Sequence, residues 1–571
     1  MAYENFKLAI YCPAGFLKNV EFEAFKKDLE FFQRYLDISK VYLEMHRGAN
    51  TLSKEKMLKI KEFFEEQNIK TSGGITATVV FGNEELDYYR IFNTFCYTNQ
   101  KHLEKLKEIV QYTASLFDEI ILDDFFFTAC TCPSCIRAKG NLSWSEFRLN
   151  LMTKVSSEYI IKPAKSVNPN VKLIIKYPNW IESYQETGYN PQTQVELFDY
   201  VYTGTETRNP VHTQQHLPRY ASYSLLRWFE NLKPGKNLGG WFDALDCIYN
   251  IGSYLEQANL TVFAKAKEIT LFDFSHLRNS VFVPALGLQL QHLDEICKHI
   301  ENPIGIPVYH PFNSYGEDHI YDYLGMVGIP FELTPHFPEN SNIVFITADC
   351  ANDKDILQKL KNHLLAGKDV IMTSGFLKAM QGRGIEDLTS VRVTDKKVFT
   401  NLFAIKTEVC SFSKYVYGKK EMLIPVLEHR TNASWQEIVA ISGENNFPVL
   451  MKDFYGRGTV YTLTTPENYS DIYNWPPEVL TEIRKVFMKN FDFYIEAGEK
   501  IGIFAYSNGA FIIESFLPYR TKVNLHIKNK NKKLIDPLKA SDLKVSIISE
   551  NENIYEIKLE PTSFRVLKLE N

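Results

Sequence analysis

Long apolar runs are missing from this 571-residue sequence, and none approaches the roughly 20 residues that a membrane-spanning helix requires. Long basic runs are missing too: the longest is the short NKNKK stretch near Lys528–Lys533, and the net charge is −5. We therefore expect neither a membrane nor nucleic acid as a partner. The start, MAYENFKLAIYCP, enters a strand pattern directly and has no signal-peptide core. This predicts a cytoplasmic protein, or a periplasmic or secreted one from which a leader has been removed.

Aromatic residues, by contrast, are abundant. They make up 14% of the chain, with 40 Phe, 32 Tyr and 6 Trp. Aromatic-rich cores account for most of them, but aromatic faces also form platforms on which the C–H faces of sugars pack. The length is too great for a single hydrophobic core and predicts two to four domains.

The first 300 residues alternate short apolar runs with amphipathic stretches, which is typical of repeated βα units. Eight such units close into a (β/α)8 barrel of about 250 residues or more. A doubly wound open sheet is the competing interpretation, but it usually has a glycine-rich first turn, and none follows Cys12. The expected strands are Lys7–Cys12, Val41–Glu44, Ile69–Ile75, Glu119–Asp123, Val171–Lys176, Phe198–Thr203, Asn237–Trp241 and Glu268–Phe272.

The pattern changes after Asn302-Pro303, so residues 1–301 are predicted to form the barrel. Residues 302–495 read as a flavodoxin-like α/β domain with a β insertion at about 390–464. Residues 496–571 hold short alternating strands that predict a small antiparallel β-sandwich.

The C-terminal ends of barrel strands build the active site of this fold. Acids, bases and aromatic residues converge there, and cleavage of a glycosidic bond needs one carboxylic acid to protonate the leaving oxygen and one carboxylate to attack or to activate water. Strand-end acids also cap helices or form salt bridges, so each one alone has a structural alternative. The catalytic candidates are Asp124, Glu206 and Asp243, and the substrate-binding candidates are Glu44, His46, Arg47, Asp123, Lys176, Trp180, Arg208 and Trp241.

Two adjacent carboxylates, Asp123 and Asp124, are the sharpest local feature. Because strand residues alternate in direction, one should face the barrel mouth and the other should pack behind it. Phe125 to Phe127 follow directly. Apolar surroundings raise the pKa of a carboxyl group, which suits a general acid. Asp124 is our choice for the catalytic member.

Three cysteines lie six to eleven residues beyond Asp124, in the pattern C-x-C-x2-C. Three thiolates so close together match a tetrahedral zinc site that lacks one ligand, and Cys96 is the best fourth. The alternatives are a disulfide or three free thiols. Four thiolates leave no position for water, so the zinc would be structural, and no organic cofactor is expected. The predicted ligands are Cys96, Cys130, Cys132 and Cys135, while Cys12, Cys247, Cys297, Cys350 and Cys410 are expected to be small buried hydrophobes.

Together these features resemble the β-galactosidases that carry a trimerisation domain. The resemblance is most specific where Leu122-Asp123-Asp124-Phe125 leads into the cysteine cluster, and there it implies zinc. It also implies a homotrimer. The acid/base glutamate of that family falls on Phe125, however, and its strand-seven nucleophile has only Asp243 as a rough counterpart.

A scheme like that of the α-galactosidases uses different strands. It puts the nucleophile at the end of strand four and the acid/base on strand six, which assigns those roles to Asp124 and Glu206 and lets Arg208 hold a hydroxyl or carboxylate. A pairing of Asp124 with Asp243 is the runner-up. The expected activity is that of an exo-acting, retaining glycoside hydrolase.

Two other functions compete with this one. Phe125 at the acid/base position suggests a carbohydrate-binding pseudoenzyme. A metal-dependent sugar deacetylase would need two or three histidines near Asp123 or Asp124. His46, His212, His216 and His276 are spread over different strands, which disfavours it.

Overall fold

The chain forms two compact units in the computed structural model, which describes residues 3–80, 88–408, 411–430, 433–549 and 551–570. Residues 1–217 and 221–297 make the first unit, and residues 218–220 and 298–571 make the second. None of the helices within these ranges is long and apolar enough to cross a membrane. Cys410, expected to be buried, lies outside the described residues.

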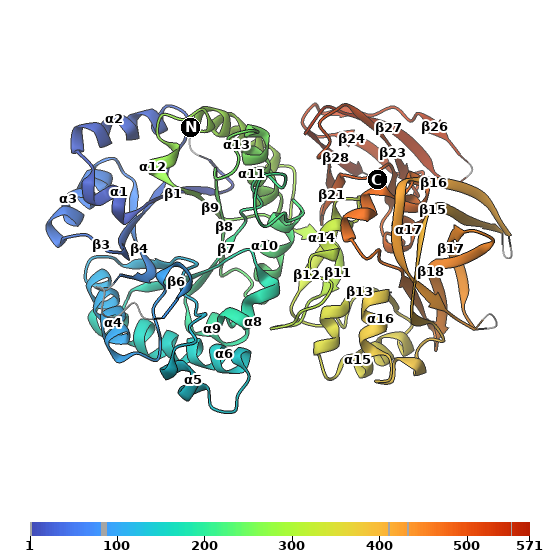
Figure 1. The fold of residues 1–571 in the computed structure, drawn as a ribbon. Coiled ribbons are helices and arrows are strands. Elements are labelled where there is room, and N and C mark those ends of the chain that lie inside the picture. The colour runs from blue at the N-terminus through green and yellow to red at the C-terminus, as the bar shows by residue number, and fades with distance from the viewer. Residues whose placement is uncertain (1–2, 81–87, 409–410, 431–432, 550, 571) are drawn as a thin grey trace. The chain divides into compact units, whose positions relative to one another are not determined.

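Eight parallel strands form the first unit's sheet, and the first strand pairs with both the second and the last, so the sheet closes on itself. A two-residue strand, β3 (Asn50–Thr51), pairs antiparallel with the end of β2. The predicted (β/α)8 barrel is confirmed, and Figure 1 shows it in blue to green. Its strands are β1 (Lys7–Cys12), β2 (Lys40–Gly48), β4 (Lys70–Val79), β5 (Glu119–Leu122), β6 (Lys172–Tyr177), β7 (Tyr200–Gly204), β8 (Asn237–Asp243) and β9 (Glu268–Phe272).

Helices between these strands form the outside of the barrel. Their starts follow from local sequence: Ser53 caps one helix by accepting the N–H of Lys56, and Ser143 forms a capping box with Glu146 at another. The principal helices are α1 (Ala14–Asn19), α2 (Phe22–Gln33), α3 (Lys54–Glu66), α4 (Gln100–Ala114), α5 (Pro133–Lys139), α6 (Trp144–Val155), α7 (Lys162–Val167), α9 (Pro191–Leu197), α10 (Ala221–Leu232), α11 (Ile251–Phe263) and α13 (Phe282–Cys297).

Side chains fill the barrel interior, as expected for eight strands. Its buried cluster contains four rings, those of Tyr11, Tyr42, Tyr202 and Trp241. Much of the aromatic content is therefore core, and Trp241 sits at the level where the core meets the strand ends.

A second parallel sheet begins the other unit. Its strands follow the order β12-β11-β13-β14-β19, and all four neighbouring pairs are parallel. This is the flavodoxin-like order, with the first strand beside the third. The strands are β11 (Ile306–Tyr309), β12 (Phe331–Thr334), β13 (Ile343–Ile346), β14 (Asp369–Thr373) and β19 (Gly458–Leu463), with helices α14 (Ile320–Gly325), α15 (Ile356–Leu365), α16 (Ser374–Met380) and α17 (Pro477–Phe487).

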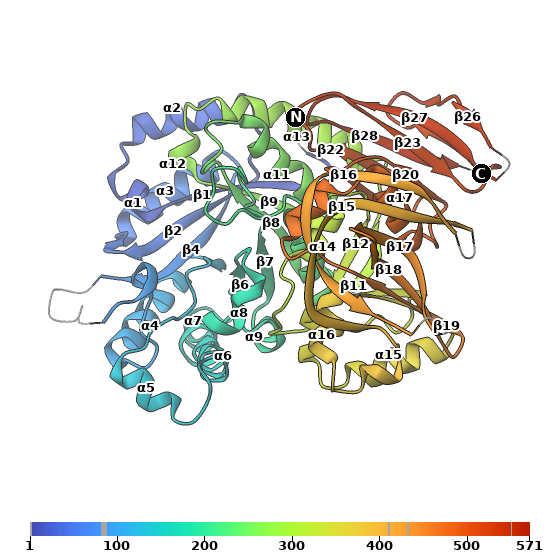
Figure 2. The same cartoon turned by 45° about the vertical axis from the view of Figure 1, so that its right-hand side comes forward.

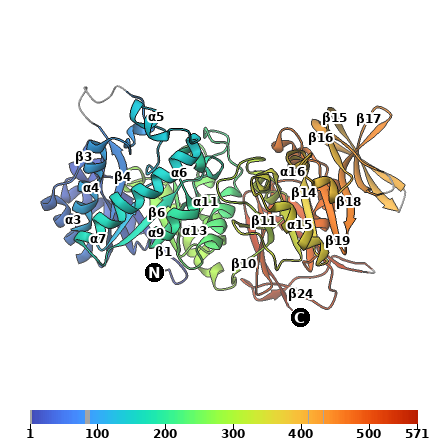
Figure 3. The same cartoon turned by 90° about the horizontal axis from the view of Figure 1, so that it is seen from below.

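Four long antiparallel strands interrupt this domain between β14 and β19. They do not fold separately: β18 pairs with β19, so the insertion extends the same sheet to nine strands. Figure 3 shows these strands in orange. They are β15 (Arg392–Glu408), β16 (Ser411–Glu428), β17 (Trp435–Ser442) and β18 (Asn445–Tyr455).

Two antiparallel sheets end the chain and form the predicted β-sandwich (Figure 2, red). The rings of Phe493 and Phe511 come from different sheets and stack with centroids 4.2 Å apart. One sheet also takes in β10 (Pro303–Ile304), from before the flavodoxin-like strands. The other strands are β20 (Phe493–Glu496), β21 (Ile501–Tyr506), β22 (Ala510–Ser515), β23 (Thr521–Ile527), β24 (Lys533–Asp536), β25 (Ser541–Asp542), β26 (Ile547–Ile548), β27 (Asn553–Leu559) and β28 (Phe564–Glu570).

Candidate active site

A cavity of about 480 Å³ opens at the C-terminal ends of the barrel strands. Its volume lies in the range usual for small-molecule sites. Nine of its lining residues carry a charge or an aromatic ring from a strand end: Arg47, Asp123, Asp124, Phe125, Lys176, Glu206, Trp241, Asp243 and Phe272; the others are Phe92, Asn179, Trp180, Arg208, His212, Thr213, Gln214, Gln215, Leu245 and Asp246.

A buried lysine joins two carboxylates at the centre of this cavity. The Nζ of Lys176, at the end of β6, lies 2.6 Å from Oδ2 of Asp124 and 2.8 Å from Oε1 of Glu206. It also lies 3.8 Å from Asp123. One cation thus holds together carboxylates that follow β5 and β7, on either side of its own strand.

The two adjacent aspartates differ sharply in acidity. Burial raises the pKa of Asp124 to about 7; Lys176 opposes this shift, while the negative charges of Asp123 and Glu206 add to it. Burial acts on Asp123 too, but Lys176 and Arg47 hold the pKa of that carboxyl below its ordinary value. One proton near neutral pH is therefore carried at Asp124, beside an ionised Asp123.

Arg47 orients the ionised member of the pair. Its Nη2 donates to Asp123 at 2.7 Å, and its Nε donates to Glu44 at 2.9 Å. Glu44 is fully buried and also accepts from Tyr11, at 2.8 Å, and from Thr76. This network lies below the cavity floor, so Glu44 positions Arg47 and has no surface in the cavity.

A second ion pair lies on the opposite side of the cavity. Arg208 donates from Nε and Nη2 to the two oxygens of Asp243, at 2.9 and 2.8 Å. Asp243 also accepts the N–H of Leu245 at 3.0 Å. Burial raises the pKa of Asp243, and Arg208 opposes this shift. Both oxygens of Asp243 are therefore engaged by the arginine fork.

Aromatic rings form the apolar surface of the site. Trp241 and Phe272 stack with centroids 5.5 Å apart, and the Nζ of Lys176 lies 4.5 Å from the Trp241 ring. Phe125 packs between Arg47, at 5.2 Å, and the ring of Phe92, at 5.3 Å. Phe125 thus forms a wall of the cavity.

The sequence-derived candidates are distributed unevenly around this cavity. Nine of them line it: Arg47, Asp123, Asp124, Lys176, Trp180, Glu206, Arg208, Trp241 and Asp243. His46 and Glu44 do not. Both ring nitrogens of His46 are engaged, one with the Thr51 hydroxyl and one with the Thr78 carbonyl, each at 2.8 Å.

Several lining residues were not among the candidates. Asn179 and Gln215 exchange amide hydrogen bonds of 3.0 and 3.1 Å across two loops. Phe272 is the last residue of β9, so the location of barrel active sites at the C-terminal ends of strands could have identified it from the sequence. Phe92 lies in the 3-10 turn Ile91–Asn93 and Gln215 in the loop between β7 and α10, where no sequence pattern indicates the direction of a side chain.

The four predicted zinc ligands come together beside the loop that follows β5. All are buried, and their sulfur atoms all lie within 4.8 Å of one another. Cys96 Sγ is 3.7 Å from the sulfurs of both Cys132 and Cys135. This spacing is far too long for a disulfide, whose sulfurs are about 2.05 Å apart. It equals the edge expected of a tetrahedron with zinc–sulfur distances of about 2.3 Å.

Family models cover most of the chain. A model described as "Probable glycosyl hydrolase, catalytic domain" matches residues 1–292, and its C-terminal domain counterpart matches residues 492–569. Residues 301–468 match "Uncharacterized protein SSO3021, second domain". The whole SSO3021 protein of Saccharolobus solfataricus is 27% identical over 620 residues, with 99% of this chain and 100% of that protein covered.

Solved structures with the same fold include glycosidases that are named for different sugars. A catalytic mutant of Gan42B, a GH42 beta-galactosidase from G. stearothermophilus, aligns with a TM-score of 0.69 at 11% identity, covering 99% of each chain. Alpha-L-fucosidase isoenzyme 2 from Paenibacillus thiaminolyticus aligns with a TM-score of 0.65 at 11% identity, covering 100% of each. At these identities the likeness shows the fold, and it confirms the predicted resemblance to the β-galactosidases at that level.

Proposed function

Because the chain belongs to the family of probable glycosyl hydrolases, we propose that it is an exo-acting, retaining glycoside hydrolase whose catalytic carboxylates are Asp124 and Glu206. The observation that carries this proposal is the bridging position of Lys176, within 2.8 Å of both carboxylates. The gap between their nearest oxygens cannot exceed the sum of the two lysine distances. That sum falls in the range of about 5–5.5 Å found in retaining enzymes, and below the roughly 6.5–9.5 Å of inverting ones.

The raised pKa of Asp124 supports it as the proton carrier. A general acid must be protonated at working pH, and burial raises the pKa of Asp124 to about 7. This gives Asp124 the acid/base role and Glu206 the nucleophilic one, the reverse of the order in the α-galactosidase-like scheme. Lys176 stabilises whichever carboxylate is ionised at each stage.

The reaction then proceeds in two steps. Asp124 protonates the leaving oxygen as a carboxylate oxygen of Glu206 attacks the anomeric carbon, which breaks the glycosidic bond and forms a glycosyl ester. Asp124, now ionised, takes a proton from water, and that water attacks the anomeric carbon and releases Glu206. Each step inverts the anomeric carbon, so the product keeps the original configuration.

The size and lining of the cavity support cleavage of a terminal sugar. A volume of about 480 Å³ is suited to a small ligand rather than to a long chain threaded through. Phe125 and Phe272 are partly exposed rings that offer a stacking face, and Arg208 has guanidinium N–H groups beyond its two bonds to Asp243 that can donate to hydroxyl groups. A β-galactoside and an α-L-fucoside are the first substrates to test, since two proteins of the same fold are named as a beta-galactosidase and an alpha-L-fucosidase.

A panel of aryl glycosides of both anomeric configurations tests the proposal. We expect turnover of at least one glycoside, and a fall in kcat of about 10³-fold or more in Asp124→Asn and Glu206→Gln. Asp273→Asn is the matched control, because Asp273 is a buried strand-end aspartate that does not line the cavity. Azide should restore turnover to the Glu206 variant and give a glycosyl azide of inverted configuration.

Two results would contradict this assignment. Full activity in Asp124→Asn or Glu206→Gln would remove those residues from the chemistry. No turnover of any glycoside, combined with saturable sugar binding at the barrel mouth, would instead favour the carbohydrate-binding pseudoenzyme suggested by Phe125.

We also propose that Cys96, Cys130, Cys132 and Cys135 hold a structural zinc ion. The support is the tetrahedral spacing of four buried sulfurs, two of which also contact the hydroxyl of Thr98. The ion would fix the segment between β5 and α6, which begins at Asp123. Zinc takes no part in the proposed reaction.

A further inference from the structure

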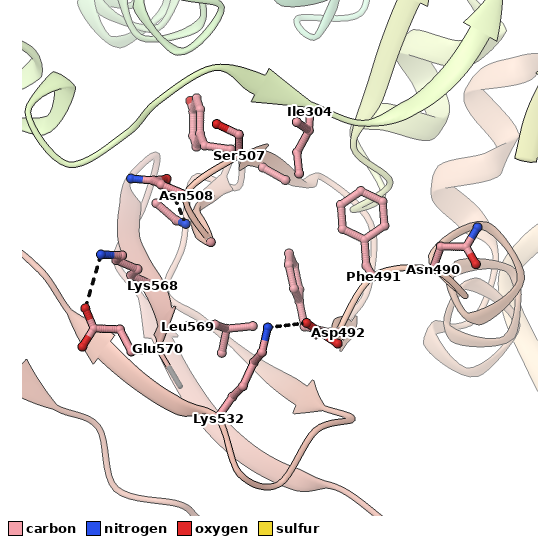
Figure 4. Close-up of a pocket in the computed structure, with 15 residues that line it drawn as sticks. Ile304, Asn490, Phe491, Asp492, Ser507, Asn508, Lys532, Lys568, Leu569 and Glu570 are labelled. Atoms are coloured by element: carbon pink, nitrogen blue, oxygen red, sulfur yellow. Dashed lines mark hydrogen bonds and ion pairs between the residues drawn. The ribbon is translucent and has the colours of Figure 1, made fainter. Parts of the chain in front are cut away.

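A second, larger cavity lies in the other unit, and all of its lining residues belong to that unit. Its volume is about 600 Å³, and its walls come from β10, from the segment that joins α17 to β20, and from β21, β22 and β28 (Figure 4). We propose that this groove binds a neutral oligosaccharide chain without cleaving it. The proposal goes beyond the reaction at the barrel and does not depend on it.

The floor and one wall of the groove are apolar. Ile304, Phe491 and Leu569 line it together with Phe493. The Phe491 ring is half-buried and meets the edge of Phe493, with centroids 5.9 Å apart, and Phe493 is fixed in turn by stacking on Phe511. Phe491 is thus an aromatic surface held by a rigid base, the kind of surface on which a sugar ring packs.

Charges of both signs are balanced around the rim. Lys532 pairs with Asp492 at 2.6 Å, and Lys568 pairs with Glu570 at 3.3 Å. Two acids facing two bases select neither an anion nor a cation. They do offer donors and acceptors side by side, which is what the neighbouring hydroxyl groups of a neutral sugar require.

The groove continues beyond this rim. A smaller hollow of about 280 Å³ shares Asn508, Lys568 and Glu570 with the larger one, so the two adjoin across those residues. Two adjoining hollows suit a ligand of several linked units better than a single sugar.

The lining carboxylates make this a binding site and not a second active site. Both Asp492 and Glu570 are exposed and paired with lysine. A general acid of the kind found in glycosidases is a buried carboxyl group, and the two carboxylates that line the groove are both on the surface.

Isothermal titration of the full-length Glu206→Gln protein tests the proposal, with cellohexaose, mannohexaose and galactohexaose as probes and dextran sulfate as a polyanion. We expect at least one neutral hexaose to bind, and Phe491→Ala to weaken that binding about tenfold or more. Phe491→Tyr keeps the aromatic face and should retain affinity. Phe454→Ala is the matched control, because Phe454 is an exposed ring on β18 of the same unit, 61% exposed, and lies outside the groove.

A second variant keeps the proposal testable if Phe491→Ala does not fold. The double substitution of Asp492 and Lys532 by alanine removes a partly exposed ion pair together, so it leaves no unpaired charge, should keep the fold intact and should still weaken hexaose binding. In wild-type background, Phe491→Ala should leave the turnover of a small aryl glycoside within twofold.

Three outcomes would overturn the proposal. They are failure of all three hexaoses to bind at millimolar concentration, binding of dextran sulfate alone, and hexaose affinity unchanged by both the Phe491 and the Asp492–Lys532 variants. Loss of the barrel's activity would not change any of these readings, because binding is measured without turnover.

Discussion

Lys176 is the residue on which the chemistry of the site depends. It is buried with almost no exposed surface and faces three carboxylates, so its own pKa is raised although burial alone would lower it. A permanent cation at this point allows two carboxylates to approach each other closely. Without it, repulsion between like charges at this distance would raise the pKa of Asp124 still further.

The acidity of Asp124 predicts the alkaline limb of the pH profile. Its pKa is raised to about 7, so the protonated form needed for leaving-group protonation is lost above that pH. We expect kcat/KM to fall about tenfold for each pH unit above 7. Measurement with an aryl glycoside whose leaving group needs little protonation is the control, because its turnover should depend less on this limb.

Replacing Lys176 should move that limb. Lys176→Met removes the positive charge that opposes the effect of burial on Asp124. The pKa of Asp124 should therefore rise by about one unit or more. Lys176→Arg keeps the charge and should leave the limb near its original position. An alkaline limb at the same pH in the Met variant would show that Lys176 does not control this proton.

At the scale of single elements, the loop after β5 depends on its cysteine cluster. If the four thiolates hold zinc, Cys135→Ser should lose about one equivalent of metal and lower Tm by several degrees. Cys297→Ser, a buried cysteine on α13 outside the cluster, is the matched control and should retain the metal. Metal analysis and thermal unfolding measure both. A cluster without bound metal in the purified protein would contradict the proposal.

A second element-scale feature is the loop after β11, which places a carboxylate at the switch point of the flavodoxin-like sheet. In many sheets of this order a ligand occupies the crevice outside the strand ends. Here the carboxylate of Glu317 accepts from the N–H of Ala348 at 2.9 Å, from the hydroxyl of Thr465 at 3.0 Å, and from Thr373. Groups that follow β13, β14 and β19 are thus joined by one side chain.

Burial makes this carboxylate sensitive to pH. It raises the pKa of Glu317 to about 6, in spite of the hydrogen bonds that favour the ionised form. The native state therefore holds a proton more tightly than the unfolded chain does, and this stabilising contribution is full below about pH 4.5 and is lost as pH rises through about 6. Urea unfolding of wild type and Glu317→Gln should show the wild type losing roughly 2 kcal/mol relative to the variant between pH 4.5 and 7. A pH-independent difference would contradict this.

At the scale of the whole molecule, the chain enters its second unit twice. Residues 218–220 belong to that unit although they lie between β7 and α10 of the barrel sequence. The hydroxyl of Tyr220 accepts the N–H of Phe331 at 3.0 Å, and its ring stacks on Phe504 with centroids 5.4 Å apart. The two units therefore do not correspond to two uninterrupted lengths of chain.

This double connection predicts the behaviour of Tyr220 variants. Tyr220→Phe should lower the free energy of unfolding by about 1 kcal/mol through the lost acceptor, and Tyr220→Ala by about 3–5 kcal/mol through the lost ring. Tyr249→Ala, an exposed tyrosine on the barrel, should cost little. Chemical denaturation measures all three. Equal losses in Tyr220→Ala and Tyr249→Ala would show that the Tyr220 segment adds nothing to the second unit.

Most of the architecture could be predicted from the sequence. Apolar periodicity marks β strands such as Lys7–Cys12 and Glu268–Phe272 almost to the residue, because a barrel strand is buried on both sides and must be short and apolar. The residues at the strand ends then indicated the active site, because the C-terminal ends of all the parallel strands lie at the same end of the barrel. The C-x-C-x2-C spacing likewise brought three sulfurs together within one loop.

The pairing of those side chains could not be predicted from the sequence. Asp243 and Glu206 are both strand-end acids in the sequence, yet one is bound by Arg208 on both oxygens and the other faces Lys176. His46 follows β2 as closely as Arg47 does but turns away to Thr51 and Thr78. The direction of a side chain and its bonding partner depend on the register between strands that are distant in sequence. Periodicity along a single strand carries no information about that register.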